Sequence, residues 1–132
     1  MADRSKFLPI GGWLITIAVT LFMIRDISPD LQQAPWAIHA NAGLGIPANV
    51  VLLIGLTGLI SALLYVFPHT SLLGAILLTG FLGGAAFVHI RVNGSAWDVG
   101  ENVVIGVAAW AGIWLRDEQL RSMLPFRRST TT

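Results

Sequence analysis

The fold of this chain is decided by sixty consecutive residues without a charged side chain, residues 31–90: LQQAPWAIHANAGLGIPANVVLLIGLTGLISALLYVFPHTSLLGAILLTGFLGGAAFVHI. A soluble protein of this size exposes most of its residues and could not keep such a stretch away from water. Lipid can surround it, because lipid tails favour apolar side chains and penalise charged ones. Sixty residues are enough for two membrane-spanning helices of about 20 residues each and a connection. The stretch therefore predicts a membrane protein.

The composition of the whole chain leads to the same prediction. Of its 132 residues, 55% are hydrophobic and 11% are charged, whereas a typical soluble domain has about 25% charged residues. The mean hydropathy is +0.73 and the net charge is +1. These values exclude an ordinary soluble enzyme, a disordered protein and a basic nucleic-acid binder. The absence of cysteine excludes disulfides, cysteine-ligated zinc and iron–sulfur clusters.

Glycine and proline divide the uncharged stretch into two candidate helices. Gly45-Ile46-Pro47 precedes an apolar run over residues 48–67. Pro68 ends this run, because proline cannot continue a helix interior. The next run covers residues 71–90.

Two further candidate spans flank this pair, at residues 8–25 and 98–116. No convincing cleavage site follows the first, so we interpret it as a retained span rather than a signal peptide. We predict an all-α membrane protein, folded as an antiparallel four-transmembrane-helix bundle in one domain over residues 1–132. The segment 116–121 alternates in charge and predicts a short surface helix at the start of a basic tail, residues 117–132.

The basic residues indicate how the chain would be oriented. Four spans place both termini on one side of the membrane, together with six basic residues: Arg4, Lys6, Arg116, Arg121, Arg127 and Arg128. The other side would hold only Arg25 and Arg91. By the positive-inside rule we expect both termini in the cytoplasm, and the loops at residues 27–47 and 91–98 outside.

Small residues recur at helical spacing in three of the predicted spans. They are Gly55, Gly58 and Ala62, then Gly80, Gly83 and Gly84, and finally Ala108 and Gly112. Small side chains let helix backbones approach closely in lipid, where hydrophobicity gives little driving force for association. We expect these residues to pack the helices of the chain against each other, although they could instead contact another protein.

The remaining polar chemistry gathers at the predicted outer ends of the helices. The candidate site residues are Arg25, Asp26, His39, His89, Arg91, Asp98 and Glu101. Ionisable residues at this depth are costly unless paired, and Glu101 with Arg25 or Arg91 is the natural pair. The residues could form a pocket for a headgroup, a quinone ring or a partner's loop. They could equally be interfacial charges that pair and attach loops to helix ends.

No catalytic motif is present, and the histidines do not form a metal site. His39 and His89 could meet, but two ligands do not define a site, and His69 is expected on the opposite side of the membrane. Nor does any glycine-rich loop follow a strand, as phosphate binding would need. We therefore assign neither catalytic nor metal-ligating residues.

The third predicted span and its surroundings resemble the DoxX-like family of small bacterial membrane proteins. The resemblance begins with residues 73–85, LGAILLTGFLGGA, and the following His89-Ile90-Arg91-Val92. It extends to Gly45-Ile46-Pro47, to residues 63–68 (LLYVFP), and to Leu115-Arg116-Asp117 with Arg121 and Leu124-Pro125. In order and spacing it covers about residues 11–128.

The resemblance implies a four-helix protein of the bacterial inner membrane. The family takes its name from subunits of a thiosulfate:quinone oxidoreductase that is linked to a terminal oxidase. Two places depart from the family pattern. Residues 25–29 read RDISP where members often carry an acidic residue and a lysine, and residues 97–102, WDVGEN, are unusually acidic. These departures fit a member adapted to a particular partner.

Three functions compete at this point. The first is a non-catalytic accessory or assembly subunit of a larger membrane complex for electron transfer or photosynthesis, or of a homo-oligomer. The alternative is a quinone- or lipid-binding component of a membrane oxidoreductase, with its pocket around Arg25, His89, Arg91 and Glu101. The sequence assigns no definite cofactor, and a bound quinone or lipid is the candidate. We expect membrane lipids as partners and no nucleic acid. A transporter is disfavoured, because inverted repeats and broken spans are not evident.

Overall fold

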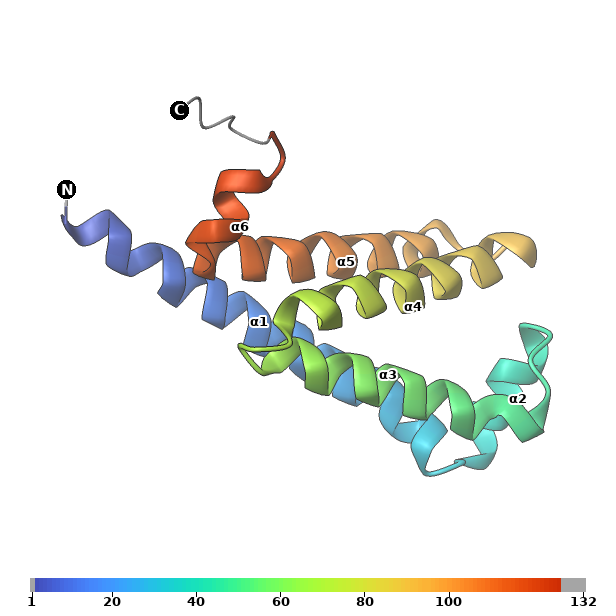
Figure 1. Ribbon diagram of the computed structural model, residues 1–132. Coiled ribbons are helices and arrows are strands. Elements are labelled where there is room, and N and C mark those ends of the chain that lie inside the picture. The colour runs from blue at the N-terminus through green and yellow to red at the C-terminus, as the bar shows by residue number, and fades with distance from the viewer. Residues whose placement is uncertain (1, 127–132) are drawn as a thin grey trace.

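The computed structural model describes residues 2–126 and is all-helical over that range. The long helices are α1 (Ala2–Leu31), α3 (Val51–Val66), α4 (Ser71–Arg91) and α5 (Ala96–Arg116). The short elements are α2 (Pro35–Gly43), the 3-10 turn η1 (Ala48–Val50) and α6 (Glu118–Met123). Figure 1 shows that α1 begins and α6 ends at one end of the molecule, whereas α2 lies at the other. These ends are called the α6 end and the α2 end below.

Within residues 2–126, three segments are long and apolar enough to cross a membrane: Phe7–Leu31, Ala48–Val66 and Ser71–Arg91. They correspond to the first three predicted spans. The helix α5 has the same length as α4, but it is absent from this set. Asp98, Glu101 and Asn102 interrupt its apolar sequence and lower its hydropathy.

The helix α1 is longer than the predicted span 8–25, because its packing face continues beyond Arg25. Val19, Met23 and Ile27 are buried and recur every four residues, so they lie on one side of the helix. Leu31 continues the same stripe and lies against Gly55 of α3. Packing thus keeps the chain helical past the predicted end, and Pro29 lies inside the helix.

The predicted loop over residues 27–47 contains a helix, α2. It begins with Pro35 at its first position, where the missing N–H costs nothing and the fixed φ favours the helix. Gly45, with φ of +81°, turns the chain after the helix toward α3. The short helix predicted from residues 116–121 is present as α6, Glu118–Met123, two residues further along the chain. Asp117 caps it by accepting a hydrogen bond from the Leu120 N–H at 3.2 Å.

The long helices pack in a closed order: α1 contacts α3 and α5, and α4 contacts the same two helices. Their shared core is formed by Val19, Met23, Ile27, Ala62, Tyr65, Ala75, Leu78, Leu82, Ala109 and Ile113. Most other large apolar side chains lie on the outside, for example Leu14, Leu53 and Val107. An apolar exterior around a small core is the pattern expected of a protein surrounded by lipid.

Close helix contacts occur at some of the predicted small residues. A methyl group at Gly58 would lie 2.6 Å from the side chain of Ile27, and one at Gly55 would lie 3.0 Å from the backbone nitrogen of Leu31. At Gly112 it would lie 2.7 Å from the Tyr65 hydroxyl. Ala62 is buried, and Ala108 packs against the core. These positions bring α3 and α5 close to α1.

Gly80, Gly83 and Gly84 do not pack against another helix of this chain, contrary to expectation. A methyl group at any of them meets no atom within 4 Å. The reason is helix rotation, because α4 turns Ala75, Leu78, Leu82 and Ala86 toward the interior. Sequence analysis missed two glycines that do make close contacts. Gly74 faces the backbone of Tyr65, and Gly12 faces the carbonyl oxygen of Gly112.

Candidate functional site

A cavity of about 620 Å³ lies at the α2 end. Toward this end α4 and α5 diverge from α1 and α3, as Figure 1 shows. Close packing holds the helices together nearer the α6 end, where Gly12, Gly74 and Gly112 allow backbone contact. The open glycines Gly80 and Gly84 line the cavity, so missing side chains on α4 contribute to its volume.

The lining of this cavity has an apolar part and a polar part. The apolar side chains include Phe22 of α1, Ile54 of α3 and Phe81 of α4. The polar side chains are Arg25, Asp26, Asp30, Asn41, Thr57, His89 and Glu101. Phe81 and His89 are eight residues apart on one helix, which is about 12 Å along its axis. The cavity therefore changes from apolar to charged along its length.

Four of the seven predicted site residues share this cavity. Arg25 and Asp26 come from α1, His89 from α4 and Glu101 from α5. Helices distant in sequence thus bring these side chains to one place.

The other three predicted residues lie outside the lining. His39 is exposed on α2. Arg91 donates through Nη2 to the carbonyl oxygen of Leu44, at 2.6 Å, so it is not the partner of Glu101. Asp98 belongs to the cap of α5, where its backbone N–H donates to Ser95 Oγ at 3.2 Å and its carboxylate accepts from the same hydroxyl at 2.8 Å. Asp98 and Arg91 therefore have structural roles at helix ends.

Among the residues that the structure describes, no side-chain hydrogen bond involves Arg25, Asp26, His89 or Glu101. In contrast, the carboxylate of Asp30 accepts a bond from the Asn41 amide at 2.9 Å. Ionisable groups near a membrane normally find partners. The four side chains border the cavity, where Arg25 and Asp26 are exposed.

Sequence analysis missed the contribution of α2 to this site. Trp36 and Asn41 line the cavity from α2, and Asp30 does so from the last turn of α1. All three fall in the segment that was predicted to be a loop. Proline followed by an uninterrupted helical run, at residues 35–43, was the available signal for this helix.

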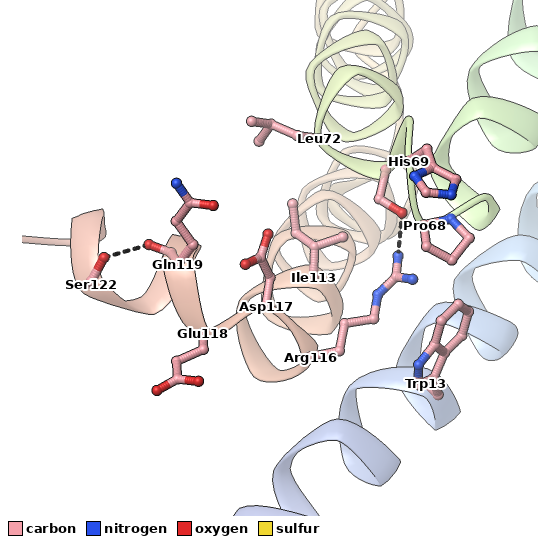
Figure 2. A pocket seen from close by; sticks show the side chains of 11 residues that line it. Trp13, Pro68, His69, Leu72, Ile113, Arg116, Asp117, Glu118, Gln119 and Ser122 are labelled. Atoms are coloured by element: carbon pink, nitrogen blue, oxygen red, sulfur yellow. Dashed lines mark hydrogen bonds between the residues drawn. The ribbon is translucent and has the colours of Figure 1, made fainter.

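A second polar cluster, at the α6 end, was also missed. Arg116 is half-buried, and its Nη2 donates to Ser71 Oγ at 3.0 Å and to the Tyr65 carbonyl at 3.1 Å. Its guanidinium stacks on the Trp13 ring, 4.2 Å from the centroid. Figure 2 shows Arg116 reaching between Trp13 and the turn with Pro68 and His69. Arg116 thus connects α5 to α1 and to the α3–α4 turn.

Buried hydroxyl groups extend this cluster into the core. The fully buried Tyr65 donates from its hydroxyl to the Ala109 carbonyl at 2.8 Å, and Thr16 donates to the Gly12 carbonyl at 2.8 Å. The open space beside Arg116 measures about 720 Å³. Nevertheless its central cation is already held by the chain, so we interpret this end as structural and the cavity at the α2 end as the candidate site.

The family assignment follows from a comparison over most of the chain. The sequence model of the DoxX-like family matches residues 14–112. The chain belongs to the DoxX-like family. Neither a curated protein nor a solved structure matches it. The matched region includes every residue that lines the cavity, from Phe22 to Glu101. Among the described residues, no three His, Cys, Asp or Glu side chains come together as metal ligands would.

Proposed function

We propose that this DoxX-like protein binds a membrane amphiphile, a quinone or a lipid, in the cavity at the α2 end. The observation that carries the proposal is the change in the lining, from Phe22, Ile54 and Phe81 to Arg25, Asp26 and Glu101. Ligand sites are typically concave and mostly apolar, with a few converging polar groups. An amphiphile with a polar head and an apolar tail matches such a lining in both parts.

The proposal places the cavity within a four-span protein of the bacterial inner membrane. In this arrangement α5 is the fourth span of an antiparallel bundle, both termini are cytoplasmic, and the α2 end faces outward. The closed packing of α1, α3, α4 and α5 supports it, since α5 has extensive contacts with two candidate spans. Arg127 and Arg128, which contribute to the charge bias, lie outside the described residues.

Single-cysteine labelling tests this topology, and the chain is suited to it because it has no cysteine. Gln32→Cys, Ala96→Cys and Gln119→Cys replace exposed residues. With an impermeant maleimide on whole cells, positions 32 and 96 should react, and position 119 should react only after lysis. If positions 96 and 119 label from the same side, α5 does not cross the membrane.

The ligand is tested by native mass spectrometry of the protein extracted with its surrounding lipid. We expect a quinone or a lipid to remain bound to the wild type. Gly84→Leu should reduce its retention at least fivefold, because Gly84 lines the cavity and a leucine side chain there would fill part of its volume. Gly83→Leu is the matched control, since Gly83 is equally open but does not line the cavity.

Circular dichroism of both variants would verify that the helices are intact. Equal retention of the amphiphile in Gly84→Leu and in wild type would contradict the proposed site. So would an equal loss in the Gly83→Leu control.

A role as a non-catalytic accessory or assembly subunit is the second candidate. It is favoured by an apolar groove of about 370 Å³ between α4 and α5, lined in part by Gly83, Gly106 and Val107. Small residues in such a groove allow the close approach of another membrane helix. The same mass spectra address this role: a larger complex of electron transfer or photosynthesis should appear in fixed ratio, whereas free protein alone would argue against it.

A further inference from the structure

The charges in the cavity at the α2 end are unequal, and this restricts the head of the amphiphile. Among the described residues, three carboxylates line the cavity, those of Asp26, Asp30 and Glu101, and one guanidinium does, that of Arg25. Because the carboxylates outnumber the basic side chains, the lining carries a net negative formal charge. An anionic head would be repelled by this lining, because like charges held close together in a partly apolar environment interact strongly.

The hydrogen-bonding capacity of the lining also restricts the head of the amphiphile. An ionised carboxylate only accepts hydrogen bonds. Asp30 already accepts from Asn41, but the structure shows no bond from another described residue to Asp26 or Glu101. These two acceptors come from different helices, α1 and α5, and lie in the same cavity. A head that satisfies both must donate hydrogen bonds.

We infer that the cavity selects an amphiphile whose head donates hydrogen bonds and carries no net negative charge. Two membrane components have this chemistry. The hydroxyl groups of a quinol can donate to Asp26 and Glu101. The ammonium group of an ethanolamine phospholipid can do the same, while its phosphate lies near Arg25. This inference rests on the proposed function and adds the class of head to it.

The tail has room on the apolar side of the same cavity. Phe22 lies one helical turn from Asp26 on α1, toward the middle of the helix, and Phe81 lies two turns from His89 on α4. Trp36, 66% exposed, lines the cavity from α2. A head bound between Asp26 and Glu101 would therefore place its tail along Phe22 and Phe81.

Competition in native mass spectrometry tests the inference on the purified full-length protein. The probes are phosphatidylethanolamine and phosphatidylglycerol with identical acyl chains, and decylubiquinol and decylubiquinone under a controlled potential. We expect the ethanolamine lipid or the quinol to bind at least tenfold better than its counterpart. A preference within the lipid pair identifies a lipid ligand, and a preference within the quinone pair identifies a quinol.

Amide substitutions test whether the carboxylates of Asp26 and Glu101 cause this preference between ligands. The double variant Asp26→Asn, Glu101→Gln should reduce the tenfold preference to less than threefold, because the amides remove both charges with little change in shape. Glu118→Gln is the control, since Glu118 lies at the α6 end. It should retain the full preference.

The outcomes separate the inference from the proposed function. If phosphatidylglycerol and the quinone bind as well as their counterparts, and Gly84→Leu still abolishes binding, the cavity is a ligand site but the inference about the head is wrong. A preference that survives the double amide variant also overturns the inference. If none of the four probes binds in a manner sensitive to Gly84→Leu, the proposed function itself fails.

Discussion

Replacing Gly74 with alanine should destabilise the protein by about 3 kcal/mol, the upper part of the usual range for overpacking. A methyl group at this position would overlap the backbone nitrogen and Cα of Tyr65. Neither atom can move by rotating a side chain, so the α3–α4 pair would have to separate. The shift should appear as a lower midpoint in thermal or SDS-induced unfolding of the purified protein in a mild detergent.

Gly83→Ala on the same helix is the matched control. Gly83 meets no atom within 4 Å, and alanine is the better helix former by up to about 1 kcal/mol. The control should therefore unfold at the same midpoint as the wild type, or slightly above it. Equal midpoints for the Gly74 and Gly83 variants would show that the two helices do not approach each other as described.

Replacing Arg116 with alanine should have the second largest effect, a loss of about 2 kcal/mol from the free energy of unfolding. The substitution removes two hydrogen bonds, to Ser71 Oγ and to the Tyr65 carbonyl, and the stacking on Trp13. These contacts connect α5 to α1, α3 and α4. Arg116→Lys should recover little, because a lysine ammonium cannot reproduce the planar guanidinium geometry.

Arg25→Ala serves as the control for this substitution, since Arg25 is exposed and its side chain bonds to no other described residue. Its effect on unfolding should stay below about 0.5 kcal/mol, as for most surface substitutions. If Arg116→Ala unfolds at the midpoint of Arg25→Ala, the cluster at the α6 end contributes no stability. The contacts of Arg116 would then add no more to the free energy of unfolding than the exposed position of Arg25 does.

The two polar clusters differ in a way that bears on function. Arg116 is held by groups of the chain, and these bonds stabilise the packing at the α6 end. Arg25, Asp26, His89 and Glu101 border a cavity and are not held in this way. Arg25 and Asp26 are exposed, so their polar atoms are open to a ligand, whereas Arg116 is enclosed by the helices around it, its Nε buried without a partner among the described residues. The contrast between the two ends therefore supports the cavity at the α2 end as the place where a ligand binds.

The sequence predicted which residues lie near the candidate site better than it predicted how they are arranged. Hydropathy and charge position placed Arg25, Asp26, His89 and Glu101 near helix ends, and these four do meet. The same reasoning also included His39, Arg91 and Asp98, which lie outside the lining, because a linear pattern does not tell which side of a helix a residue occupies. Asp98 could have been assigned to a cap from Ser95 three residues earlier, which is a known start signal for a helix.

The sequence by itself determined that the chain is a helical membrane protein. It located the second and third spans to within one residue at each end, but it ended the first span six residues too early. Those properties depend on the composition of each segment, so they can be read without knowing its neighbours. Tertiary structure alone decided that Gly74 packs while Gly83 stays open, that Arg116 is held within the protein, and that the α2 end encloses a cavity. These outcomes depend on the rotation and crossing of helices, which result from contacts between residues far apart in the chain.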